Sequence, residues 1–192
     1  MELRLPTEEE IVGLAHLAEQ GVHPPEQMPF FTAWTDGIGK PGFVDEFTRF
    51  HRTQREEWRP EKWQLLLGVW VDRELVGTQG AEKTGERTVE TGSWLGQRFQ
   101  GRGIGTEMRA AMLTLLFDGL GIEEATSGAL EGNVASARVS EKLGYEPAGE
   151  DVAAPRGAPV RNRKFRLMRE RWRSPVPVEI QGLSNCRSLF GL

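Results

Sequence analysis

Residues 97–106 read QRFQGRGIGT, a glycine-rich turn that runs, after Glu107, into the apolar stretch MRAAMLTLLF. Glycines occupy positions 101, 103 and 105. Glycine loses more backbone entropy on folding than other residues, so three glycines here indicate that the backbone must be free of side chains. A strand, a glycine turn and a helix N-terminus together form an anion site, because successive N–H groups and the helix dipole attract phosphate. The stretch therefore predicts a phosphate-binding turn, with a tight structural corner as the alternative.

Two better-known phosphate motifs are absent from this turn. The nucleotide P-loop ends in Gly-Lys-Ser/Thr, whereas Gly105 is followed by Thr106 and Glu107. The dinucleotide motif GxGxxG fails because Met108 stands where its third glycine belongs.

Composition restricts the class of protein. The 192 residues carry a net charge of −4 and a sequence pI near 5.6, which argues against nucleic acid or an anionic membrane as the main partner. No apolar run is long enough for a membrane span, and the N-terminus MELRLPTEEE does not resemble a signal peptide. Cys186 is the only cysteine, and the three histidines have no ligand spacing. We expect a cytoplasmic, metal-free protein.

The order of predicted elements indicates one mixed sheet with helices around it. An ordered, aromatic loop is expected over 21–42, a domain over 1–171, and a separate extended tail over 172–192. Hydrophobic periodicity predicts helices over 8–20, 43–57, 104–117 and 133–143, and strands over 2–5, 63–71, 75–83, 87–95, 125–130, 145–152 and 161–171.

Two motifs in this order resemble those of the GNAT acyltransferase superfamily. The stretch 100–105 fits its Q/R-x-x-G-x-G/A signature, and 133–145 resembles its second motif, an Asn that opens a helix ending in Gly-Tyr. The chain looks most like the ribosomal-protein N-terminal acetyltransferase (RimJ/RimL-like) branch. The resemblance implies an α/β fold: a central mixed, mostly antiparallel sheet of about six or seven strands flanked by about four helices.

The resemblance also implies where acetyl-CoA or another acyl-CoA binds. Trp94 and Asn133 each have a plainer reading, as a core aromatic and as a helix N-cap. The expected cofactor-binding residues are Trp94, Leu95, Gln100, Gly101, Arg102, Gly103, Ile104, Gly105, Thr106, Asn133 and Ser136.

Glu90 and Ser140 are the expected catalytic residues. Glu90 is the one acid in the run TVETGSW, and its position resembles that of the glutamate that accepts the amine proton in many members; the alternative is a surface strand residue. Many members carry tyrosine where Ser140 stands, so Ser140 is expected only as a minor relay. Tyr145, the only tyrosine, is expected to bury its ring after Gly144. On the helix over 133–143, Ala135, Val139 and Leu143 are expected to face the core.

The acyl acceptor is expected opposite the coenzyme, against the 21–42 loop. Met28, Phe31 and Trp34 are the expected substrate-binding residues, although aromatic side chains there would also pin the loop to the core.

Three functions stay open. The first is an acyl-CoA-dependent N-acyltransferase, using acetyl- or succinyl-CoA, that acts on an amine of a protein N-terminus or small molecule. The second is a GNAT-fold module that binds CoA and has weak or no catalysis. The third is a nucleic-acid- or protein-binding domain built on the arginine-rich stretch 155–173, which the acidic chain as a whole disfavours. The oligomeric state is open between monomer and homodimer.

Overall fold

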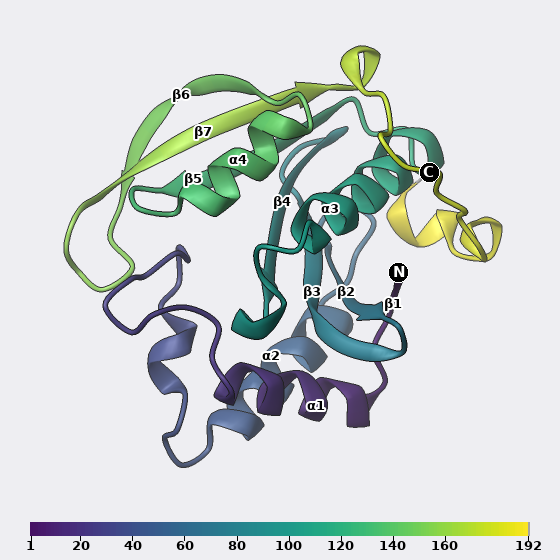
Figure 1. Ribbon diagram of the computed structural model, residues 1–192. Helices are drawn as coiled ribbons and strands as arrows, with labels where there is room; N and C mark the ends of the chain where they lie inside the picture. Colours follow the sequence, from purple (N-terminus) through teal and green to yellow (C-terminus); the bar gives the residue numbers. More distant parts are fainter. Residues whose placement is uncertain (192) are drawn as a thin grey trace.

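The computed structural model describes residues 1–191, in which seven strands form one sheet in the order β1-β2-β3-β4-β5-β7-β6 (Figure 1). Neighbouring strands are antiparallel except β4 and β5, which are parallel. The strands are β1 (Glu2–Arg4), β2 (Gln64–Val71), β3 (Glu74–Lys83), β4 (Thr88–Leu95), β5 (Glu124–Leu130), β6 (Glu146–Ala153) and β7 (Val160–Met168). The α-helices are α1 (Glu8–Glu19), α2 (Phe43–Glu56), α3 (Ile104–Thr114) and α4 (Val134–Lys142). The predicted α/β class and mostly antiparallel sheet are confirmed.

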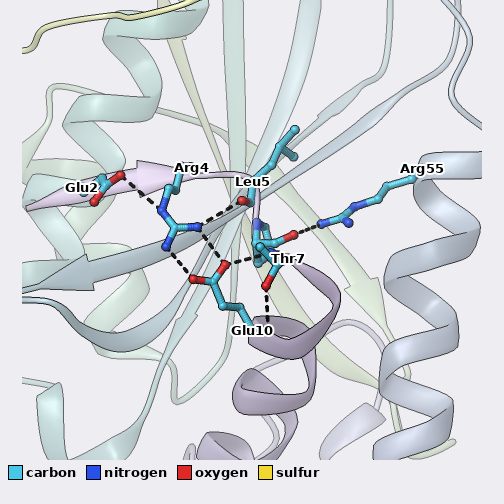
Figure 2. Close-up of polar contacts among 7 residues, drawn as sticks. Glu2, Arg4, Leu5, Thr7, Glu10 and Arg55 are labelled. Atoms are coloured by element: carbon cyan, nitrogen blue, oxygen red, sulfur yellow. Dashed lines mark hydrogen bonds and ion pairs between the residues drawn. The ribbon is translucent and has the colours of Figure 1, made fainter.

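A capping box starts α1 and joins it to β1. The Thr7 hydroxyl accepts a hydrogen bond from the Glu10 backbone N–H at 3.2 Å, and the Glu10 carboxylate accepts one from the Thr7 backbone N–H at 2.8 Å. Figure 2 shows the Arg4 guanidinium donating to the same carboxylate, which lowers the pKa of Glu10 to about 2. Arg4 also lies over the ring of Trp70, 3.8 Å from its centroid. These contacts fix the angle at which α1 leaves the first strand.

The helices cover the two faces of the sheet (Figure 1). α3 and α4 pack on the face that carries Val89 and Ala125, in the largest hydrophobic cluster. α1 and α2 pack against one another, with Phe43 and Phe47 meeting the partly buried Trp94. Because Val89 and Trp94 differ by an odd number of positions on β4, they face opposite sides of the sheet. No helix within residues 1–191 has both the length and the apolar character needed to cross a membrane.

The buried side of α4 differs from the prediction. Ala135 is exposed, whereas Ala137, Ser140 and Leu143 are buried and Val139 is half-buried. Residues 137 and 140 are one turn apart and lie on the buried side of the helix, whereas position 135 faces solvent. The expectation that Ala135 contacts the core is therefore wrong.

α3 is buried more extensively than one apolar stripe predicts. Ile104, Met108 and Met112 are buried, as the helical spacing of these apolar residues predicts, but Ala111 and Leu115, which continue the same spacing, are only half-buried. The buried set on this helix also includes Ala110, Leu113 and Arg109. A short π-helical segment (Leu115–Gly119) continues α3 and packs under the C-terminal segment.

The C-terminal segment 172–192, expected as a separate extended tail, packs on the domain at several of its described residues. Trp172 and Phe190 are buried in the same cluster as α3. Phe190 lies edge-on to Trp58 and Trp63, and the indole N–H of Trp58 donates to the Leu189 carbonyl at 2.7 Å. Short 3₁₀ turns interrupt the segment. It therefore contributes to the core of the domain.

His51 of α2 makes stability depend on pH. Its ring is 4% exposed beside Phe47 and Phe50, and burial, then the charge of Arg55, lowers its pKa from 6.5 to about 4. Because the unfolded chain binds the proton more tightly, this contribution is complete above pH 6.5 and is lost between pH 6.5 and 4. In urea unfolding, the free energy of unfolding of wild type should fall by about 2 kcal/mol more than that of His51→Leu when the pH is lowered from 7 to 5. His16→Leu, which changes an exposed histidine, is the control. If wild type and His51→Leu lost equal amounts of unfolding free energy over this pH range, the prediction would be contradicted.

Candidate active site

β4 and β5 separate from one another halfway along their length. Their parallel pairing covers Thr88 to Glu90 and ends at the pair Glu90↔Thr126. β4 nevertheless stays paired with β3 as far as Leu95. At the point of divergence the Thr91 hydroxyl donates to the Thr126 carbonyl at 3.0 Å. The last part of β4 therefore has a free edge that leads to the glycine-rich turn.

The turn presents a series of unpaired backbone N–H groups. Within residues 1–191, no group accepts a hydrogen bond from the backbone N–H of positions 101–105. Gly101 and Gly103 have φ of 72° and 85°, which side-chain-bearing residues rarely adopt. A Cβ added at either would meet no atom within 4 Å, so the space in front of the turn is open. This arrangement fits the pyrophosphate of a coenzyme, with N–H groups and the α3 dipole as ligands.

Side chains around the turn divide into structural and available ones. Gln100 donates to the carbonyls of Val22 and Leu95, at 2.7 and 2.9 Å, and so ties the turn to the end of β4. Arg98 pairs with Glu74. Arg102 is exposed and has no hydrogen bond or ion pair with the residues that the structure describes. Arg102 is thus the cation of this stretch that is available to a phosphate.

The side chains of Trp94 and Leu95 lie on opposite faces of β4. Leu95 is buried beside Ile104 and Met108 of α3. Trp94 packs with Trp34 and Phe47 on the other face, with ring centroids 5.6 and 6.3 Å away. The side chains of both residues pack in the core. Only their backbone groups, on the free edge of β4, are available to a ligand.

Asn133 and Ser136 connect α4 to neighbouring segments. The Asn133 side chain accepts from the Ser136 backbone N–H at 3.1 Å, as an N-cap, and donates to the Pro29 carbonyl at 3.2 Å. The Ser136 hydroxyl lies 3.5 Å from the Gly128 carbonyl of β5. The first turn of α4 thus joins the 21–42 loop to β5 beside the divergence of the strands.

Ser140 lies inside a buried polar cluster. Its side chain is 0% exposed, and its hydroxyl donates to the Ser127 hydroxyl at 3.4 Å. Tyr145, buried as expected, has its hydroxyl 3.0 Å from that of Thr91. Arg109, which the sequence analysis did not single out, completes the cluster. Its signal was an arginine within the apolar helix MRAAMLTLLF.

Glu90 stands on the opposite face, at the last position of β4 that pairs with β5. Its neighbours are Glu82, paired with it across β3 and β4, and the ion pair of Lys164 with Asp151 at 2.6 Å. Glu90 is exposed at the surface, yet partial desolvation, then the charge of Glu82, raises the pKa of its carboxyl group, while Lys164 opposes the change. A carboxylate with a raised pKa is a better proton acceptor near neutral pH.

The predicted acceptor residues separate in the structure. Phe31 is 46% exposed and lies over β5, where a Cβ added to Gly128 would be 2.5 Å from its ring. Trp34 is half-buried and packs on Trp94. Met28 is half-buried in the same loop. Phe31 and Glu90 thus lie on the face opposite α3, and Trp34 holds the loop against Trp94 of β4.

The free edge of β4 and the amide-lined turn fit a phosphate-bearing coenzyme, and the Glu90 carboxylate lies on the face opposite α3. Comparison with known proteins identifies the family to which this chain belongs. The model of the acetyltransferase (GNAT) domain matches residues 1–146. The chain therefore belongs to the GNAT acetyltransferase family and is an acyl-CoA-dependent N-acyltransferase.

Solved structures share the fold at low sequence identity. RimJ from Mycobacterium smegmatis, in complex with CoA-disulfide, is 20% identical, with a TM-score of 0.70 over 88% of this chain and 81% of that one. The ribosomal-protein-alanine N-acetyltransferase from Brucella melitensis is 14% identical, with a TM-score of 0.67 over 88% and 99%. A mutant of the spermidine N-acetyltransferase from Vibrio cholerae is 14% identical, with a TM-score of 0.66 over 88% and 96%.

Proposed function

We propose that this enzyme transfers an acetyl or succinyl group from CoA to a primary amine, with Glu90 as the proton acceptor. The observation that carries the proposal is the position of Glu90 at the last β4–β5 pair, while the unpaired amides of the turn lie at the other end of the free β4 edge. The backbone of Gly101 to Thr106 would hold the pyrophosphate, with Arg102 as its charge partner. The thioester, when bound, supplies an activated acyl group.

Glu90 prepares the nucleophile. An amine must be neutral to attack, so Glu90 takes its proton, directly or through water. The nitrogen of the neutral amine then bonds to the acyl carbon while the carbon–sulfur bond breaks. The electron pair of that bond leaves on sulfur, and the nitrogen loses its surplus proton to water. A thiol pKa of about 8.5 lets sulfur leave as thiolate near neutral pH. Ser140, being buried, acts only by holding Ser127 in place.

The charge around Glu90 favours a cationic acceptor. Glu82 and Glu90 lie opposite one another on β3 and β4, and Lys164, the cation that acts on Glu90, is already paired with Asp151. Two proteins of the same fold are named for the amines that they acetylate, a ribosomal-protein alanine and spermidine. A protein N-terminus and a small polyamine are therefore the two acceptor classes to compare.

A screen for released thiol tests this proposal. The enzyme should release CoA from acetyl- or succinyl-CoA only when an amine is added, and mass spectrometry should find the acyl group on that amine. Peptides with a free N-terminus and their N-blocked forms make a matched pair, as do spermidine and its fully acylated form. Tight CoA binding without thiol release across the panel would favour a CoA-binding module instead.

A further inference from the structure

A buried guanidinium, which the chemistry above does not use, occupies the divergence of β4 and β5. Arg109 of α3 is 3% exposed. One of its terminal nitrogens donates to the Ser127 hydroxyl of β5 at 3.0 Å, and the other donates to the Ser93 hydroxyl of β4 at 3.1 Å. Both serines lie beyond the last β4–β5 pair, so Arg109 bridges the strands where their backbones no longer do.

The charge of Arg109 has no carboxylate partner within the described chain. None of the ion pairs formed by residues 1–191 includes it, and its Nε has no hydrogen-bond acceptor there. Its closest ionisable neighbour is Tyr145, which is neutral at physiological pH. A buried cation without a counter-ion is strongly unfavourable. Such a side chain beside a reaction site points to an anion that forms during the reaction.

Ser93 connects this buried charge to the accessible edge of β4. It is half-buried, whereas Ser127 is only 3% exposed. The Ser93 oxygen accepts from Arg109, and no residue within 1–191 accepts the Ser93 proton. Hydrogen bonds polarise one another in a chain, so donation from a guanidinium makes the Ser93 hydroxyl a stronger donor.

We propose that Ser93, polarised by Arg109, donates a hydrogen bond to the negative charge that develops on the leaving sulfur. The inference rests on the proposed function. Before the step, Glu90 takes a proton from the amine. In the step, the amine nitrogen bonds to the acyl carbon and loses its surplus proton to water, and the electron pair of the carbon–sulfur bond stays on sulfur. The sulfur takes a proton from water later. Ser93 is then a catalytic residue and Arg109 a positioning residue, and the chain needs no tyrosine at position 140.

The thiol of bound CoA reports this interaction directly. Because Cys186 is the only cysteine, the Cys186→Ala background leaves the CoA thiol as the only thiol in the sample. The pH dependence of its alkylation by iodoacetamide gives its pKa in the complex. With Ser93 and Arg109 present, that pKa should lie at least about one unit below 8.5. Ser93→Ala and Arg109→Met should each raise it by about one unit, which is a tenfold smaller thiolate fraction at neutral pH.

Kinetics and stability separate this role from a structural one. Both variants should lower kcat by roughly 10- to 100-fold with KM for acyl-CoA little changed, as expected for a donor that acts mainly in the transition state. Arg109→Met should melt no lower than its parent, since an apolar side chain of similar volume replaces an unpaired buried charge. The double variant should be no worse than either single one. Thr114→Val, which removes another buried α3 hydroxyl, should leave the thiol pKa unchanged.

Three results would overturn all or part of the inference in distinguishable ways. An unchanged thiol pKa in Ser93→Ala and Arg109→Met, with CoA bound and thiol release intact, would overturn it and leave the proposed function standing. A parent enzyme that binds no CoA would overturn both. A lower melting temperature with unchanged kcat in Arg109→Met would assign that residue to the fold alone.

Discussion

Gly105→Val will weaken CoA and acyl-CoA binding by roughly a hundredfold or more while the chain stays folded. The Gly105 N–H lies among the unpaired amides of the turn, and a side chain there keeps phosphate away from the backbone. Losing two hydrogen bonds to a charged group, each about 1.5–3 kcal/mol, corresponds to at least this change in Kd.

Position 105 is the clean place for this test. An added Cβ would lie 3.8 Å from Val139 and 3.9 Å from Leu95, which are ordinary contacts, and the φ of Gly105 is not positive. Gly103 has φ of 85°, so valine there adds backbone strain to the loss of binding.

Isothermal titration calorimetry with CoA, alongside melting curves, checks the prediction. Gly13→Val, on α1 and with a Cβ contact of 3.6 Å to Leu75, is a matched glycine-to-valine control and should bind CoA like wild type. If Gly105→Val gained as much melting temperature from CoA as wild type does, the turn would not be the pyrophosphate site.

Most of the fold could be predicted from the sequence, because the patterns that specify helices and strands are local and recur along the chain. Alternating residues on β4 and the helical spacing of Ile104, Met108 and Met112 specify element type without any tertiary information. The glycine turn was equally readable, since Gly101 and Gly103 have the positive φ that only glycine adopts easily.

Features that depend on contacts between residues far apart in the sequence could not be predicted in the same way. The buried side of α4 depends on segments that are distant in the sequence, and the Asn133 amide that begins the helix donates to the carbonyl of Pro29, about a hundred positions earlier. The C-terminal segment is anchored by Trp58 and Trp63, which meet Phe190 only in the folded chain. Arg109 looked like one charge on a helix, because its serine partners come from two different strands.

Glu90→Gln will lower turnover with a primary amine by roughly a hundredfold at neutral pH, with CoA affinity unchanged. Glutamine cannot take the amine proton, and a positioned base contributes about 10²–10⁴-fold. The deficit should shrink as pH rises, because more of the amine is then neutral in solution. Steady-state rates across pH, with a peptide α-amine of pKa about 7.7–8.0 as acceptor, would show this.

The neighbours of Glu90 provide the decisive control. Glu82 faces Glu90 across β3 and β4, and its charge raises the pKa of Glu90, while Lys164 lowers it. Glu82→Gln should therefore keep turnover within about threefold of wild type at neutral pH and move the acid limb of kcat/KM to lower pH. Lys164→Met should move that limb to higher pH, since it removes a cation and leaves Asp151 unpaired. A strand glutamate without a catalytic role would give neither displacement, so unchanged limbs in both variants would assign the proton transfer to another group. Opposite displacements from two neutralising substitutions, one on β3 and one on β7, would identify Glu90 as the titrating base, because both charges act on its carboxylate.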